Sequence, residues 1–147
     1  MKKRYGDNIR LLFTDTDSLM YEVCTDDFYH EMWSMKEHFD LASYPKTSTF
    51  YDGTNNKVVG KFKDEANGDN IVEFVGLKAK MYSYQTLNTG ADNNALTTKK
   101  RAKGLQRAAV AKLRHHEFKA QLDHPEDNFI VNRRFGSKLH QIYGIEV

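Results

Sequence analysis

Two runs of mainly apolar, strand-forming residues, at positions 9–13 and 19–23, are separated by the polar residues 14–18. Residues with apolar, aromatic or β-branched side chains favour strands, whereas Asp, Thr and Ser favour turns. We therefore predict a β hairpin whose tip carries two carboxylates, Asp15 and Asp17.

The following residues, from Asp26 or Asp27 to about His38, predict a helix that begins at an aspartate cap. Its apolar residues recur at helical spacing, so we expect them to pack into the core. They are Phe28, Met32, Met35 and Phe39. Residues 41–56 contain proline, glycine and several small polar residues, which predicts a long surface loop.

Residues 57–65 predict another strand, with Gly68 in the turn that follows it. We expect this strand to pair antiparallel with the next stretch, residues 71–84. In that stretch apolar residues alternate with Lys78, Lys80, Tyr82 and Tyr84, which predicts one apolar face and one basic, aromatic face. Such a face suits the backbone of a nucleic acid. An exposed edge strand whose lysines prevent edge pairing gives the same pattern.

A basic segment follows a polar loop and precedes a predicted amphipathic helix that begins after Gly104. The helix has an apolar stripe of Leu105, Ala108, Ala109 and Leu113. The segment contains the cations Lys99, Lys100, Arg101 and Lys103. They could bind phosphates, or they could form a solvated run of charges or a targeting patch. The apolar residues of the tail predict one or two further strands that return to a core. They are Ile130, Val131, Leu139, Ile142, Tyr143 and Ile145.

The composition is that of an ordinary globular domain: 147 residues, 39% hydrophobic, with a formal net charge of +2. No apolar run has the length of a membrane span, and no signal peptide is evident, so we expect an intracellular protein without a membrane partner.

The single cysteine, Cys24, is expected to be a buried thiol at the end of a strand. His115 and His116 are adjacent, which does not suit joint metal binding on a helix, and we expect surface histidines. The sequence lacks the motifs of zinc fingers, P-loop enzymes and serine hydrolases.

The two carboxylates of the hairpin tip are the strongest indication of chemistry. In an extended strand, the side chains of Asp15 and Asp17 emerge on the same side and can face one cation. Hard oxygen ligands suit Mg²⁺ or Mn²⁺. Asp-x-Asp is also a common turn sequence, but acidic groups within an apolar hairpin are costly unless they are compensated.

Residues 13–19 resemble the Asp-Thr-Asp-Ser palm motif of family B DNA polymerases, and Lys80-Met81-Tyr82 resembles their later Lys-x-Tyr motif. The amino-acid sequence of residues 1–23, 74–84, 99–104 and 115–119 is similar to sequences of the protein-primed branch of this family, which is found in Polinton or Maverick transposable elements and related viruses. The resemblance implies nucleotidyl transfer to a DNA primer by two-metal chemistry, with Mg²⁺ or Mn²⁺ as cofactor.

The resemblance also implies roles for individual residues. Asp17 corresponds to the main catalytic metal ligand and Asp15 to the accessory carboxylate, while Thr16 and Ser18 shape the turn. The expected DNA-binding residues are Lys78, Lys80, Tyr82, Lys99, Lys100, Arg101 and Lys103. Implied partners are a DNA primer-template, deoxynucleoside triphosphates and a terminal priming protein, at a nuclear or viral replication site.

The chain departs from the family in two respects: the earlier Asp-x-x-Ser-Leu-Tyr-Pro palm motif and the fingers helix are absent from it. We therefore expect the C-terminal palm and thumb fragment of a longer enzyme, or a gene remnant, inactive without the N-terminal polymerase portion. Two alternatives are a noncatalytic DNA-binding module and a magnesium-dependent nuclease.

The expected fold is α+β. Residues 1–94 would form a small antiparallel palm-like sheet with a helix packed on its back. Residues 95–147 would form a mostly helical, thumb-like extension with short strands.

Overall fold

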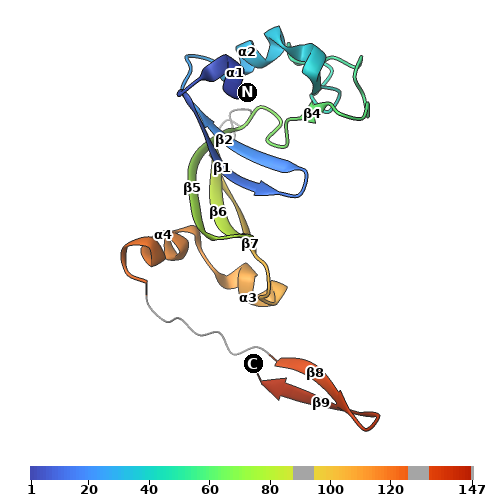
Figure 1. Cartoon of the computed structure of the whole chain (residues 1–147), viewed down its shortest axis with the longest axis vertical. Coiled ribbons are helices and arrows are strands. Elements are labelled where there is room, and N and C mark those ends of the chain that lie inside the picture. Colours follow the sequence, from blue (N-terminus) through green and yellow to red (C-terminus); the bar gives the residue numbers. More distant parts are fainter. Residues whose placement is uncertain (88–94, 126–132, 147) are drawn as a thin grey trace. The chain divides into compact units, whose positions relative to one another are not determined.

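The computed structural model describes residues 1–87, 95–125 and 133–146. It confirms an α+β fold of small sheets and short helices (Figure 1). No helix in these ranges has the length and apolar character needed to cross a membrane. In chain order the elements are α1 (Lys2–Tyr5), β1 (Ile9–Asp15), β2 (Ser18–Val23), α2 (Phe28–Ser34), a 3₁₀ turn (Lys36–His38), β3 (Phe39–Asp40), β4 (Phe62–Lys63), β5 (Asn70–Lys78), β6 (Met81–Leu87), β7 (Leu96–Ala102), α3 (Arg107–Lys112), α4 (His115–Asp123), β8 (Arg133–Lys138) and β9 (Gln141–Glu146).

The chain divides into two compact units, which we describe separately. Unit 1 comprises Met1–Val72 and Thr86–Thr97, and unit 2 comprises Glu73–Gln85 and Thr98–Val147. The boundary predicted between residues 94 and 95 falls within the second segment of unit 1. The assignment of a palm-like and a thumb-like part stays a prediction from the resemblance.

In unit 1, β1 and β2 form the predicted antiparallel hairpin, which is shown in blue in Figure 1. Asp15 lies opposite Ser18, so the connection consists of the two residues Thr16 and Asp17. The register shifts between Leu11 and Phe13, where β1 contains one residue more than its partner. Bulges of this kind increase the twist of a hairpin and change which side chains share a face.

The predicted helix begins at Asp27, whose Oδ1 accepts a hydrogen bond of 3.0 Å from the backbone N–H of His30. Its fully buried residue Met32 packs with Leu41 and Tyr44. The segment predicted to be a surface loop therefore supplies part of the core of unit 1. The helix was expected to lie on the back of the acidic hairpin, but no residue of β1 or β2 belongs to this cluster.

The prediction of a strand over residues 57–65 was largely wrong. Only β4 is extended, and it pairs in parallel with β3 instead of antiparallel with the following strand. Lys57 and Gly60 have positive φ angles, of 58° and 85°, which interrupt an extended backbone. Gly68, with φ of 90°, lies in the predicted turn.

Residues 71–84, predicted as one strand, form two. Strands β5 and β6 are joined by the two-residue turn Ala79-Lys80, and the sheet has the order β5-β6-β7. A two-residue connection joins antiparallel strands. Lys80 has a φ of 58° and lies in the turn, so it does not share a strand face with Tyr82.

The basic segment was expected to be an exposed approach to a helix, but most of it lies in β7. Helix α3 is shorter than predicted, and none of its residues is buried. Among the described residues of unit 2, the buried helical residues are His115 and Phe118 of α4, and the strand residues Val75 and Ala102 are also buried.

The tail forms the antiparallel β8–β9 hairpin, which confirms the predicted strands, although Leu139, Ile142 and Tyr143 are exposed instead of contributing to a core. Ile130 and Val131 lie outside the described residues. Cys24, at the end of β2, is exposed and not buried as expected.

We expect Met32→Ala to lower the free energy of unfolding of unit 1 by about 2–5 kcal/mol, because a fully buried side chain leaves a cavity. Urea titration can be followed by the fluorescence of Trp33, the single tryptophan, which packs against the same cluster. Val59→Ala is the control, since Val59 is 98% exposed and its truncation should change the midpoint little. Equal midpoints for the two variants would contradict this description of the core.

Candidate functional site

The two acidic residues of the hairpin tip occupy different backbone positions. Asp15 is the last residue of β1, whereas Asp17 is the second residue of the turn. The backbone is not one extended strand through both residues, so the predicted placement of both side chains on one side by alternation does not apply. The two residues lie on either side of Thr16, one at the end of the strand and one in the two-residue turn.

The two carboxylates also differ in their surroundings. Asp15 lies on the same face of the hairpin as Phe13 and the buried Met20, because cross-strand partners share a face, and it is half-buried. Asp17 is exposed, and its carboxylate forms no hydrogen bond or ion pair with any described residue. The hairpin therefore presents one open carboxylate beside one that is partly held.

Thr16, between them, has a φ of 60°. A β-branched residue in the left-handed region is strained, typically by about 1–3 kcal/mol, and such strain is often found at functional sites. The Thr16 hydroxyl donates a hydrogen bond of 3.3 Å to Oδ1 of Asp15. Thr16 thus lies in the turn itself, whereas Ser18 is the first residue of β2, and the turn-shaping role implied for both stays a prediction.

The carboxylate oxygens of the turn are the type of ligand that a hard cation prefers. Mg²⁺ is commonly held by one or two protein carboxylates together with water and substrate phosphates, so Asp15 and Asp17 fit it as a partial ligand set. Within the described ranges no group of three or more His, Cys, Asp or Glu side chains is placed to hold a metal. The turn alone should therefore bind a divalent cation weakly.

Unit 2 contains a second candidate surface, on one side of the β5-β6-β7 sheet. The rings of Tyr82 and Tyr84 stack with centroids 6.3 Å apart, and Phe74 lies 6.1 Å from Tyr82. The ammonium of Lys99 lies 5.9 Å from the centroid of the Tyr84 ring. Arg101, two residues further along β7, is exposed and shares this side by strand alternation. We call these five residues the aromatic-basic face.

The other predicted DNA-binding residues lie elsewhere. Lys100 is on the opposite side of β7, where its ammonium donates hydrogen bonds to the carbonyl oxygens of Ala111, at 3.0 Å, and Leu113. Lys78 is exposed at the end of β5, and Lys80 follows in the turn. The backbone N–H of Lys103 donates to the carbonyl oxygen of Lys80 at 3.0 Å, which brings the end of β7 to this turn.

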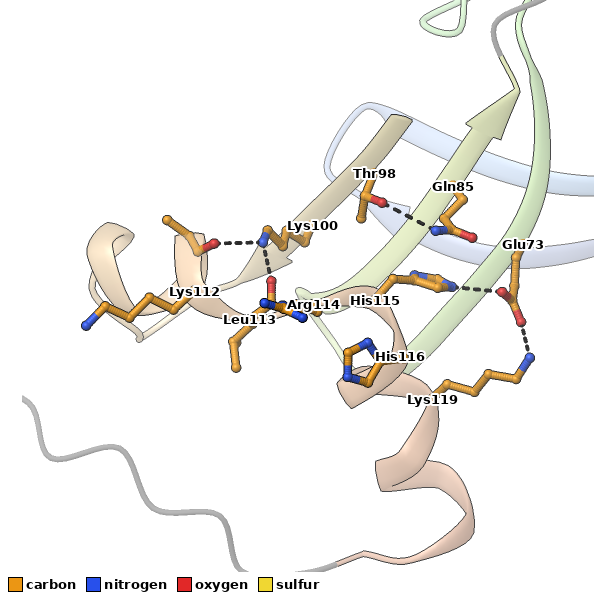
Figure 2. A pocket seen from close by; sticks show the side chains of 11 residues that line it. Glu73, Gln85, Thr98, Lys100, Lys112, Leu113, Arg114, His115, His116 and Lys119 are labelled. Carbon is orange, nitrogen blue, oxygen red and sulfur yellow. Dashed lines mark hydrogen bonds and ion pairs between the residues drawn. The ribbon is translucent and has the colours of Figure 1, made fainter. Parts of the chain in front are cut away.

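The side of the sheet opposite the aromatic-basic face holds α4 through a chain of polar groups (Figure 2), and we call it the helix face. The hydroxyl of Ser83 lies 2.8 Å from Nδ1 of His115. Nε2 of His115 lies 3.1 Å from one carboxylate oxygen of Glu73, and the other oxygen lies 2.5 Å from the ammonium of Lys119. The prediction of two surface histidines was therefore wrong for His115, which is 8% exposed, and confirmed for His116.

This arrangement of Ser, His and Glu is structural. Ser83 is fully buried, so its hydroxyl has no access to a substrate. The hydrogen bonds from Lys119 and then from His115 lower the pKa of Glu73, and Glu73 in turn raises the pKa of Lys119. The sequence offered one signal for this contact, a Ser within a strand that otherwise alternates with tyrosines.

The sequence matches no model of a known protein family, no curated protein and no solved structure. The resemblance to family B DNA polymerases consequently stays a prediction from short motifs, and the geometry of the two surfaces carries the functional argument.

We expect Glu73→Gln to destabilise unit 2 near neutral pH, because it weakens the attachment of α4. Since the folded state lowers the pKa of Glu73, its contribution is present above the ordinary carboxyl pKa of 4.5 and is lost as the pH falls through the lower folded value. The difference in urea midpoint between wild type and variant should therefore be large at about pH 7 and small at about pH 3. Circular dichroism can report it, and a difference that grows on acidification would contradict the arrangement.

Proposed function

We propose that this chain is part of a DNA polymerase of the family B type, contributing carboxylates for a catalytic metal and a surface that holds the primer-template. The observation that carries the proposal is the acidic turn. Two aspartates flank a strained, β-branched Thr16, and one of them is open to solvent. A turn that served only to reverse the chain would be more stable with glycine or asparagine at this position.

The bound metal would polarise phosphate oxygens and activate the primer hydroxyl. Asp17 is the residue that can take part as a direct ligand, because its carboxylate is exposed. Asp15 is held by Thr16 and partly covered, so it contributes negative charge and orientation. This division agrees with the main and accessory roles that the resemblance implies.

The aromatic-basic face supports a grip on DNA. Tyrosine rings provide surfaces for sugars or bases, and Lys99 and Arg101 provide positive charge for phosphates on the same side of the sheet. Lys78 at the end of β5, Lys80 in the following turn and Lys103 just after β7 would add phosphate contacts at this end of the strands. Lys100 contributes less to this grip, since its ammonium is already bound to two carbonyl oxygens on the other side.

The two alternative functions give different results in one assay. The chain is incubated with a labelled primer-template, Mg²⁺ and deoxynucleoside triphosphates. The proposal expects binding without extension or degradation, because the motifs of the other palm aspartate and the fingers are absent from this sequence. Degradation would favour the nuclease, and extension by this chain alone would contradict the idea that it is a polymerase part.

We expect Mn²⁺ to broaden the backbone NMR signals of the hairpin tip at lower Mn²⁺ concentrations than those of other segments. Because the turn supplies only part of a ligand set, the binding should be weak. Asp17→Asn should remove most of this broadening. Asp26→Asn is the matched control, because Asp26 is an exposed aspartate of the same unit, outside the turn. Persistence of the effect in the Asp17 variant would exclude the turn as a metal site.

Lys99→Gln should weaken primer-template binding and reduce the slope of log affinity against log salt by about 0.9, the value for one lost phosphate contact on duplex DNA. Fluorescence anisotropy over a range of salt concentrations measures this slope. Lys46→Gln, which removes an exposed lysine in unit 1, should leave the slope unchanged. If both substitutions reduced the slope equally, binding would depend on the net charge of the chain and not on the aromatic-basic face.

A further inference from the structure

The helix face of unit 2 is hollowed into an open cleft, shown in Figure 2. Strands β5, β6 and β7 form one wall, and residues 111–116 and 119 form the other. Its volume is about 910 Å³, within the range of sites that hold a ligand the size of a nucleotide. The cleft lies on the opposite side of the sheet from the aromatic-basic face, so the DNA grip proposed above does not use it.

Positive charge is concentrated in this cleft. Four of its lining residues are Lys or Arg, namely Lys100, Lys112, Arg114 and Lys119, and Glu73 is its single carboxylate. The cleft thus has a formal charge of +3 with both histidines neutral, whereas the whole chain has only +2. An apolar or cationic ligand is disfavoured there, and an anion is favoured.

Two of these cations, Lys119 and Lys100, are held by contacts within the fold. Glu73 pairs with Lys119 and His115, and so neutralises part of the charge at one end of the cleft. Lys100 is held by two carbonyl oxygens, and since an ammonium group has three donors, one of them is left for a ligand. A cation held in this way loses little conformational entropy when it meets a ligand.

Arg114 and His116 remain for an incoming group. Within the described residues, neither side chain lies within ion-pair distance of a carboxylate. Both side chains line the cleft together with Lys100, and Figure 2 shows the ammonium of Lys112 pointing away from them. The cleft thus combines the cations Lys100 and Arg114 with the imidazole of His116, and charge-assisted hydrogen bonds from such cations suit a phosphate group.

The remaining polar groups extend the site beyond one anion. Gln85 and Thr98, joined by a hydrogen bond of 3.4 Å, line the strand wall and offer donors and acceptors without charge. We propose that this cleft binds a phosphate-bearing ligand, with the phosphate on Arg114, His116 and Lys100 and its organic part toward Gln85 and Thr98. The phosphate belongs either to a free nucleotide or to a nucleic-acid backbone.

The test is an NMR titration of the full chain, without divalent metal, with thymidine 5′-monophosphate and separately with a short oligothymidylate. The expected result is a shift of the signals of residues 111–119 and of the Gln85 side-chain amide. Arg114→Gln should weaken binding by about tenfold or more, because it removes a charge-assisted hydrogen-bonding group. Saturation by the mononucleotide identifies a nucleotide site, and saturation by the oligonucleotide alone identifies a backbone site.

Two further variants keep the test decisive. Arg114→Lys retains the charge without the planar fork and should bind with intermediate affinity. Lys46→Gln removes one positive charge from unit 1 and should bind as the wild type does. Folding of the Arg114 variants is checked by the retained signals of α4, whose cap uses the backbone N–H of residue 114 and the side chain of Glu117.

The proposal is overturned if neither probe shifts the cleft signals, or if Lys46→Gln weakens binding as much as Arg114→Gln does. This outcome is separable from a failure of the polymerase proposal. That proposal depends on metal at the acidic turn, and Asp17→Asn should leave this titration unchanged.

Discussion

The attachment of α4 through Ser83, His115 and Glu73 is the interaction on which the account of unit 2 depends. A small sheet gains stability by packing against a helix, and among the described residues of unit 2 the buried apolar side chains are Val75, Ala102 and Phe118. A buried histidine with a partner at each ring nitrogen makes the attachment specific, because an unsatisfied partner would be costly. By covering one side of the sheet, α4 leaves the other side for aromatic and cationic residues.

The acidic turn of unit 1 follows a different physical logic. Its stability comes from the β1–β2 pairing, and the turn itself stores strain at Thr16 instead of relieving it. The open carboxylate of Asp17 adds nothing evident to folding. When a residue lowers stability and has no evident structural role, a functional role explains its presence better.

The sequence predicted those features whose signals are local. The hairpin tip, the cap at Asp27 and the turn at Gly68 each depend on residues within a few positions. The turn at Ala79-Lys80 was missed because it lacks the glycine or asparagine that usually marks a positive φ. The predicted alternation of side chains through Tyr82 and Tyr84 was correct within β6. Its extension back to Lys80 was wrong, because Lys80 lies in the turn. The positions of Lys100 and His115 depend on contacts with residues more than ten positions away, which periodicity does not show.

We propose above all that DNA binds the aromatic-basic face of the β5-β6-β7 sheet. Photo-crosslinking of a primer-template that carries 5-bromouracil, followed by mass spectrometry of the peptides, tests it most directly. The account predicts adducts at Tyr82 or Tyr84, which are the tyrosines of that face. Adducts confined to tyrosines outside the sheet, such as Tyr51 or Tyr143, would contradict it.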